Sequence, residues 1–485
     1  MEAKERQRIR RIIGSDPVTA PTPVVSRLRG TPFAGVRRGT IPDDVLDSMD
    51  LVLRVAALAI RYGAGMRDVE AMTLATAAAL GLADDYLEYD LTFSSAMVAY
   101  APPGLDPVVR VLVVRSPARD YSRLAALHEY VTELAAGHAG HSDARAKLAA
   151  VESARKPYRR SLVRVAWAMM TSLIVLRLGG DAVAVATSFG ATIVIDWIGH
   201  HLYRRGAPWP LVTLAGAVLA AFIAIVVGAT TVSGLGHLDP DVARRTSLVV
   251  AGGVMMLLPG LQLVSVIEDG LWDYPLSAGA RLFQALLGTS AIIAGVGAVF
   301  AAAPAVGADV APLTDPLRGE LSAHWWTYLL IVFAATLAAA VGNRVPPRMV
   351  MITGLAGTAG VAVLMLSQGF GLSAQIGTFL GAFVVGAVGR AWAARYHTAA
   401  MAVVVPGITM LLPGLAVVEA LRQLSGGNPV DGLIHLLGAA TTAGAIALGS
   451  VMGGMLASSL EQGTVRLRRG VWPARDPEHV GQQVS

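Results

Sequence analysis

Four carboxylates stand inside long apolar stretches or at their ends, where an ionised side chain is costly and therefore marks a candidate functional position. They are Asp196, Glu268, Asp269 and Glu419. Each could carry a coupling proton, and Asp196 could instead bind a substrate ammonium group. The alternative is that Asp196 lies near lipid headgroups and pairs with His200 or Arg204, and that the other three are solvated at loops.

The second candidate site is a repeated six-residue sequence with a helix-breaking pair at its centre. Met-Leu-Leu-Pro-Gly-Leu occurs at 256–261 and again at 410–415. Proline removes a backbone donor and glycine tolerates non-helical backbone, so each Pro-Gly pair can free polar backbone groups for a ligand. We expect substrate to bind at the breaks and at two polar residues beside the first: Pro259, Gly260, Gln262, Ser265, Pro413 and Gly414. The alternative is that both pairs only kink packed helices.

Other kinds of chemistry lack support in the sequence. The chain has no cysteine, which rules out disulfides, thiolate metal sites and cysteine nucleophiles. It has no P-loop, HExxH or GxSxG sequence, and its histidine pairs lack a third metal ligand. The net charge is only +5, and the binding of nucleic acid needs basic residues clustered on one surface. We therefore expect no catalytic residue, cofactor, metal or nucleic-acid partner.

The elements that must position these residues follow from an uneven composition. Hydrophobic residues make up 54% of the 485 positions and charged residues only 15%, against about 25% charged in an average soluble protein. The first 160 positions nevertheless hold 41 charged residues. Residues 1–42, rich in Arg and Pro, are expected to be disordered. Residues 43–160 predict a cytoplasmic soluble α+β domain, in which four helices accompany a small antiparallel sheet formed by 86–94, 96–100 and 108–114.

Ten apolar stretches follow, each long enough to cross a hydrocarbon core of about 30 Å. They run over about 161–178, 182–202, 208–232, 246–267, 280–303, 324–342, 348–367, 372–393, 398–418 and 431–458, the last being long enough to break at a glycine. The six-residue repeat lies in the fourth and ninth stretches, which divides them into five plus five. The predicted fold class is a membrane all-α bundle of ten transmembrane helices with an N-terminal soluble α+β domain.

The two halves are predicted to be inverted relative to each other. The first covers residues 161–303 and the second 324–460, joined by an outer loop at 304–323. Because five is odd, the second half must enter the membrane upside down, an arrangement typical of secondary transporters. Short loops rich in Lys and Arg mark the cytoplasmic side, which places both termini, including the tail 461–485, in the cytoplasm of a multi-pass inner-membrane protein. Arg164 and Arg177 are expected to reach toward lipid headgroups.

Several motifs, taken in order, resemble the threonine/serine exporter family of bacteria. In the first third they are Gly63-Ala-Gly-Met-Arg-Asp-Val-Glu70, Tyr89-Asp-Leu-Thr-Phe93 and the stretch from Arg115 to Leu124. In the apolar part they are Leu258-Pro-Gly-Leu261, Gly279-Ala-Arg281 and the second Leu-Pro-Gly. The resemblance covers about residues 45–460, and the chain looks most like the full-length actinobacterial members.

The resemblance implies export of threonine and serine driven by the proton gradient, with protons, membrane lipid and a small amino acid as partners. It also leaves dicarboxylate export open, because some family members are linked with it. Arg67, Asp68 and Glu70 match a motif of the family's N-terminal domain and suggest a regulatory role, although helix capping and ion pairs explain them equally well. Two further alternatives are an enzyme or sensor anchored by the bundle, and a passive channel. A homo-oligomer is also possible.

Overall fold

The computed structural model describes residues 41–468 except for 83, 104, 116–118, 138–140, 232–239, 307–323 and 426–427. Three sequence expectations therefore lie mostly outside the described residues: disorder over 1–42, an outer loop over 304–323 and a tail over 461–485.

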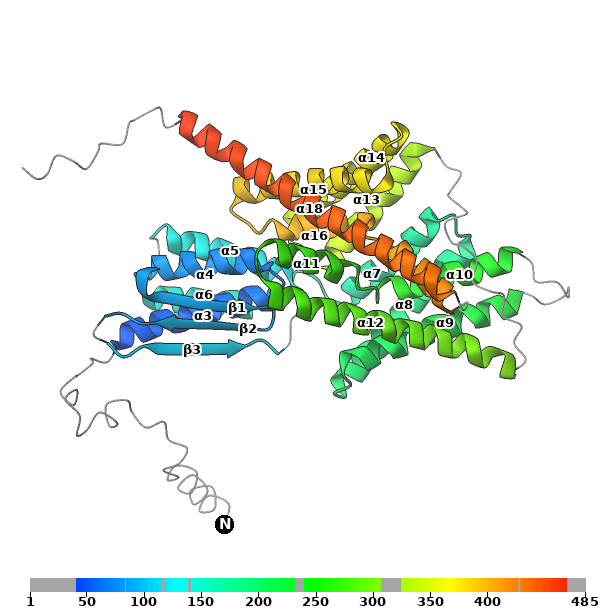
Figure 1. The fold of residues 1–485 in the computed structure, drawn as a ribbon, viewed down its shortest axis with the longest axis horizontal. Coiled ribbons are helices and arrows are strands. Elements are labelled where there is room, and N and C mark those ends of the chain that lie inside the picture. The colour runs from blue at the N-terminus through cyan, green and yellow to red at the C-terminus, as the bar shows by residue number, and fades with distance from the viewer. Residues whose placement is uncertain are drawn as a thin grey trace, which may run out of the picture.

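The first third combines four helices with one small sheet (Figure 1). The elements are α3 (Asp43–Tyr62), α4 (Met66–Ala79), the short helix η1 (Asp84–Tyr86), β1 (Leu87–Thr92), β2 (Ser95–Tyr100), β3 (Val108–Val113), α5 (Tyr121–Ala135) and α6 (His141–Ser153). The strands pair antiparallel in the order β1-β2-β3, with Leu87 opposite Tyr100 and Ser95 opposite Val113. The predicted element types are thus confirmed, and their bounds differ by only a few residues.

Two local features fix how α4 meets the rest of the molecule. Gly63 ends α3 with φ of 92°, a left-handed conformation that glycine adopts without the penalty of a Cβ. The chain then turns, and α4 starts at Met66 after Gly65. This start faces the apolar helices, because a Cβ built on Gly65 would lie 2.9 Å from Met401 Cε.

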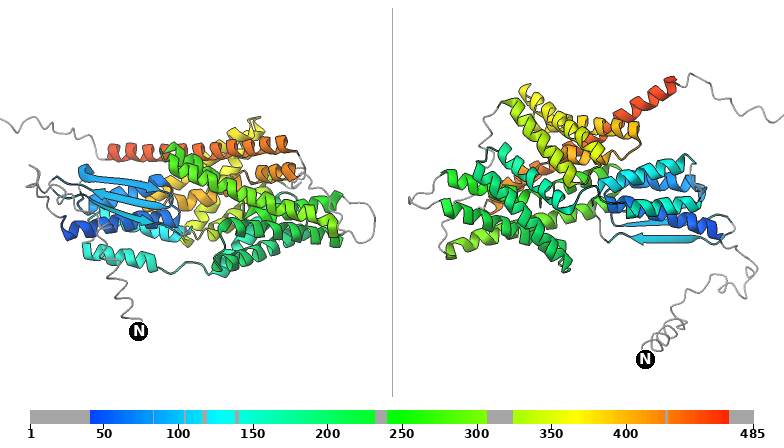
Figure 2. Two further views of the ribbon diagram at one scale, coloured as in Figure 1. Left: turned by 60° about the horizontal axis from the view of Figure 1, so that its bottom comes forward. Right: turned by 180° about the vertical axis from the view of Figure 1, so that it is seen from behind.

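The remaining described residues are almost entirely helical. The helices are α7 (Arg160–Arg177), α8 (Ala182–Arg204), α9 (Trp209–Thr231), α10 (Pro240–Met255), α11 (Gly260–Leu271), α12 (Pro275–Ala302), η2 (Ala303–Val306), α13 (Trp325–Gly342), α14 (Pro347–Gly369), α15 (Ala374–Tyr396), α16 (Met401–Gly407), η4 (Ile408–Leu411), α17 (Gly414–Ser425) and α18 (Pro429–Arg468). Figure 2 shows the sheet and its helices at one end of this bundle.

Seven of the described helices are long and apolar enough to cross a membrane: α8, α9, α12, α13, α14, α15 and α18. An eighth span results if α10 and α11 count as one, bent by 47° between Met255 and Gly260. The chain is therefore a multi-pass, mostly helical membrane protein. The predicted total of ten would also need α7, which contains three arginines, and the interrupted segment from α16 to α17, so it stays a prediction.

The long last helix does not break at a glycine, so that expectation is wrong. α18 runs unbroken for 40 residues, and its glycines let it approach α15 closely. A Cβ on Gly449 would lie 2.3 Å from the carbonyl oxygen of Phe379, and one on Gly453 only 2.0 Å from that of Phe383. Small residues at such crossings are typical of membrane helix packing.

Candidate functional site

The two copies of the six-residue repeat meet in space. Both Pro-Gly pairs interrupt their segments, and α11 begins at Gly260 while α17 begins at Gly414. A Cβ on Gly260 would lie 3.5 Å from Leu412 Cβ, and one on Gly414 would lie 2.9 Å from Met255 Sδ. Each break therefore packs against the residues that precede the other break.

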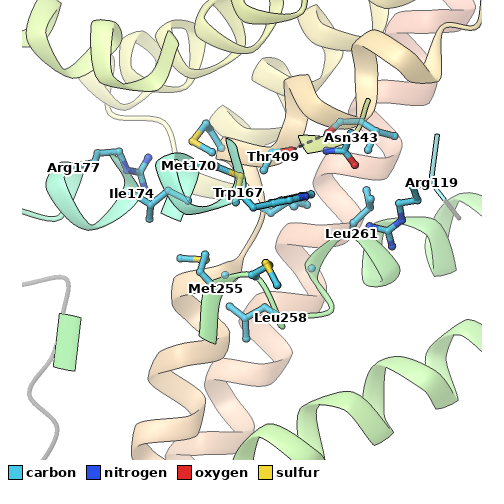
Figure 3. A pocket seen from close by; sticks show the side chains of 16 residues that line it. Arg119, Trp167, Met170, Ile174, Arg177, Met255, Leu258, Leu261, Asn343 and Thr409 are labelled. Carbon is cyan, nitrogen blue, oxygen red and sulfur yellow. Dashed lines mark hydrogen bonds between the residues drawn. The ribbon is translucent and has the colours of Figure 1, made fainter. Parts of the chain in front are cut away.

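A cavity of about 110 Å³ lies at this meeting point. Its lining includes Gly260, Gly414 and the leucines before both Pro-Gly pairs, together with side chains from α7, α16, η4, the residue just after α13 and the chain just before α5. Figure 3 shows Trp167 and Met170 close to the centre of this group, with Arg177 and Arg119 on opposite sides. A cavity therefore lies at the two breaks, and the binding of substrate there stays a prediction.

Two arginines give the cavity its charge. The Arg177 guanidinium donates from Nη1 to the hydroxyl of Tyr328 at 2.9 Å and lies 5.5 Å from the centre of that ring. Arg119 reaches the cavity from the start of the chain that leads into α5. No Asp or Glu is among the described residues that line it. With two helix N-termini also present, the cavity favours an anionic group.

Uncharged polar groups complete the lining. Thr409 donates to the carbonyl of Val405 at 3.1 Å, and Asn343 donates to the carbonyl of Ala339 at 2.8 Å. The Asn343 carbonyl also accepts the backbone N–H of Tyr121 at 3.4 Å. These bonds fix the side chains on the helices that carry them and leave the Thr409 hydroxyl oxygen able to accept a hydrogen bond.

The other residues expected at the breaks do not line this cavity. Pro259 and Pro413 act through the backbone, since each precedes the first residue of a new helix. Gln262 and Ser265 lie further along α11, where both are partly buried. Of the six expected binding residues, the structure therefore brings only Gly260 and Gly414 to the cavity surface.

Asp196 lies outside this cavity and forms an ion pair instead. Its Oδ2 lies 2.8 Å from Nε of Arg164, and about a quarter of each side chain is exposed. The pairing joins α7 to α8. The expected alternatives, His200 and Arg204, are thus wrong as partners, and so is the expectation that Arg164 simply extends to headgroups.

The carboxylates at the end of α11 have two different environments. Asp269 is buried and forms an ion pair with Arg281 of α12, Oδ2 to Nε 2.8 Å. It also accepts the backbone N–H of Met66, at the start of α4. Glu268 lines a second cavity of about 220 Å³ and forms no ion pair with any described residue. Glu419, in α17, is buried and accepts a hydrogen bond from Gln423 at 2.9 Å.

The Arg67, Asp68 and Glu70 motif contacts the turn between α11 and α12. The Arg67 guanidinium lies 3.7 Å from the ring centre of Trp272, a cation–π contact. Glu70 accepts the hydroxyl of Tyr89 at 2.6 Å and that of Tyr274. The bond to Glu70 raises the pKa of Tyr89 to about 12, because it favours the protonated phenol. Arg67 and Glu70 therefore connect α4 and β1 to the turn between α11 and α12, while Asp68 lies in the first turn of α4.

Sequence reasoning missed most of the polar side chains of the cavity at the breaks. Arg119, Asn343 and Thr409 lie near helix ends or in turns, where polar residues are ordinary. Arg177 is recognisable in the sequence as a cation in an apolar stretch, but such a residue is expected to extend toward lipid headgroups. The lining comes from five separate segments, so no local spacing could reveal it.

Comparisons with known proteins agree with the motifs. Residues 50–303 match the family model "Putative threonine/serine exporter", and residues 328–456 match "Threonine/Serine exporter, ThrE". A protein of Mycobacterium tuberculosis described as "Probable threonine/serine exporter" is 30% identical, over 86% of this chain and 78% of its own length. The "Threonine/serine exporter" of Corynebacterium glutamicum is 26% identical, over 85% and 83%. No solved structure matches.

The family model spans more than half of the chain, and the mycobacterial relative aligns over most of both proteins. The family is one of transporters and not of enzymes. The chain therefore belongs to the threonine/serine exporter family.

Proposed function

We propose that this protein exports threonine and serine from the cytoplasm by proton-driven antiport. The observation that carries the proposal is the cavity enclosed by both Leu-Pro-Gly breaks. Secondary transporters bind substrate at discontinuous helices near the midplane of the bilayer, and here two discontinuous segments meet. The names of the two relatives supply the substrate class.

A five-plus-five repeat is supported by matching contacts in the two halves, and because five is odd we propose that the halves are inverted. In the first, α9 packs on α12 and α10 on α8; in the second, α15 packs on α18 and α16 on α14. The first helices of the halves, α7 and α13, pack on each other, and α11 contacts α18 much as α17 contacts α12. In this arrangement α7 and the segment from α16 to α17 complete ten spans, and one half rocks against the other.

The cavity offers an amino acid an oriented site. The carboxylate of the bound amino acid would face Arg119, Arg177 and the N-termini of α11 and α17. The hydroxyl of the amino acid would face Thr409. Because no carboxylate is among the described residues that line the cavity, we propose that carbonyl groups released at the two breaks bind the ammonium. Asp196, which pairs with Arg164 outside this cavity, is then not needed for that role.

Among the four expected proton carriers, we favour Glu268. Asp196 and Asp269 each have an arginine partner at 2.8 Å, so one oxygen of each carboxylate is already engaged in an ion pair. The Glu419 carboxylate accepts a hydrogen bond from Gln423. Glu268 has no such partner among the described residues and faces a cavity. We further propose that the domain over 43–160 and both termini are cytoplasmic, in the bacterial inner membrane, and that Arg67, Asp68 and Glu70 couple this domain to transport.

Dicarboxylate export is the second candidate, favoured by the two arginines and the lack of a carboxylate in the cavity. A substrate panel distinguishes the two. Proteoliposomes that hold the purified full-length chain should transport labelled threonine and serine, with unlabelled succinate competing weakly. Transport of succinate without threonine or serine would establish the second candidate in place of the first.

A further inference from the structure

A second cavity lies between the first third of the chain and the apolar helices. It measures about 220 Å³, and its lining comes from the start of α4, the end of α11 and parts of α15, α16 and α18. The same region of Figure 1 shows α4, α11, α16 and α18 converging. The cavity therefore lies where the start of α4 meets the helical bundle.

The charged residues of this cavity are balanced in number. Arg67 and Arg390 face it together with Asp68 and Glu268. None of the four forms an ion pair with a described residue; Arg67 stacks on Trp272, and Arg390 donates from Nε to Ser458 at 3.0 Å. Two cations and two anions that do not neutralise each other by contact suit a ligand that carries both charges.

Small residues keep the space open. Gly386 on α15 and Gly454 on α18 both line the cavity, at a crossing where a Cβ on Gly386 would lie 2.1 Å from the carbonyl oxygen of Ser450. The helices therefore approach closely there without side chains that would fill the cavity between them. Arg390 follows Gly386 by one helical turn, which places its side chain at the same surface.

The two cavities lie along the same pair of helices. Gly260 and Leu261 of α11 line the cavity at the breaks, and Glu268 lines the second. Glu268 lies seven positions after Leu261 on α11, which is a rise of about 10 Å. On α16, Val405 lines the first cavity and its neighbour Val404 the second. The two cavities therefore lie about two helical turns apart along α11 and are lined by neighbouring residues of α16.

We propose that this second cavity is a capture site for a free amino acid in its zwitterionic form. The ammonium is bound by Glu268 and Asp68, and the carboxylate by Arg390 with Arg67. The inference rests on the proposed export function and adds to it a first binding station that comes before the cavity at the breaks. The cavity at the breaks is called the inner cavity from here on. A site with both charges selects zwitterions over the dicarboxylates that the arginines of the inner cavity would accept.

The natural absence of cysteine allows a direct test in the full-length protein. A single Ser458→Cys substitution places one thiol in the capture site, and Thr409→Cys places one in the inner cavity. A small methanethiosulfonate reagent forms a mixed disulfide with the introduced thiol and releases methanesulfinate, and the rate of this modification is measured in proteoliposomes. We expect threonine to slow the modification at position 458, and neither 3-hydroxybutyrate nor threoninol, which each lack one charge, to do so at the same concentration.

Charge variants in the Ser458→Cys background test the assignment of residues. Glu268→Gln and Arg390→Gln should each raise the threonine concentration for half protection about tenfold, as expected for loss of a charged hydrogen-bond partner. Arg395→Gln, one turn further along α15 and outside the cavity, is the matched control and should leave protection unchanged.

The outcomes separate this inference from the proposed function. If threonine protects position 409 and is transported but leaves position 458 unprotected, the capture site is wrong and the export function stands. If the protein transports neither threonine nor serine, the export function is wrong, and protection of position 458 still decides the capture site. Protection by succinate in place of threonine would overturn the capture site whatever the result for transport.

Discussion

Asp269 of α11 and Arg281 of α12 form a buried ion pair, with Oδ2 and Nε 2.8 Å apart and only 3% of the aspartate side chain exposed. The same carboxylate accepts the backbone N–H of Met66. One side chain thus holds together the half-helix that follows the first Pro-Gly break, the helix after it and the start of α4.

Removal of one partner of this pair should destabilise the protein strongly. Arg281→Gln leaves Asp269 as a buried charge without its cation, which costs about 3–5 kcal/mol in comparable pairs. Thermal unfolding in detergent should show a large drop in midpoint. The double change Asp269→Asn with Arg281→Gln should recover part of the loss. A drop no larger than that of the exposed control Arg395→Gln would contradict the structural role.

The inner cavity should tolerate a small side chain at Gly260 and not a large one. A Cβ there would lie 3.5 Å from Leu412 Cβ, which is ordinary contact, so Gly260→Ala should keep most of the transport rate. Gly260→Leu fills the space between the breaks and should lower the rate more than about tenfold, or ~1.4 kcal/mol. Initial rates in proteoliposomes measure both variants.

Gly270→Leu on the same helix is the matched control, because a Cβ on Gly270 would have no atom of another described residue within 4 Å beyond its chain neighbours and the backbone of its own helix. It should transport at nearly the normal rate. Equal loss of transport in the Gly270 and Gly260 variants would mean that the effect arises from the helix and not from the cavity.

Arg177 should matter for affinity more than its hydrogen-bond partner does. Arg177→Gln removes a cation that lines the cavity and should raise the KM for threonine about tenfold, since bonds to charged groups contribute about 1.5–3 kcal/mol. Tyr328→Phe removes only the hydroxyl that accepts from Nη1 and should change KM by less than about fivefold. If Tyr328→Phe changes KM as much as Arg177→Gln does, the arginine acts through its partner and not on the substrate.

The bond between Tyr89 and Glu70 should stabilise the protein in a pH-dependent way. Because the folded pKa of Tyr89 is raised to about 12, from about 10 when unfolded, the contribution is complete below pH 10 and is lost as pH rises through 12. Tyr89→Phe should cost about 0.5–1.5 kcal/mol near neutral pH and progressively less above pH 10. Unfolding midpoints over pH 7–11.5 measure the difference, and a difference that grows with pH would contradict the assignment.

The sequence allowed the broad architecture to be predicted because its signals are local. Helix bounds near Tyr62 and Met66 follow from Gly63, strand positions follow from β-branched residues, and the breaks follow from the Pro-Gly pairs. The cavity linings were not predictable, because Arg119, Arg177 and Asn343 come together only through packing of distant helices. For the same reason the sequence marks Asp196 as a candidate residue but does not identify Arg164, 32 residues earlier, as its ion-pair partner.

The central claim is that the meeting of the two Leu-Pro-Gly breaks forms the substrate site of a proton-driven amino-acid exporter. The most direct measurement is uptake of labelled threonine by inside-out proteoliposomes with an acidic interior. We predict accumulation above the external concentration, which a proton ionophore abolishes and which Gly260→Leu loses while Gly270→Leu keeps it. Threonine that only equilibrates, or that accumulates equally in the Gly260→Leu variant, would contradict the claim.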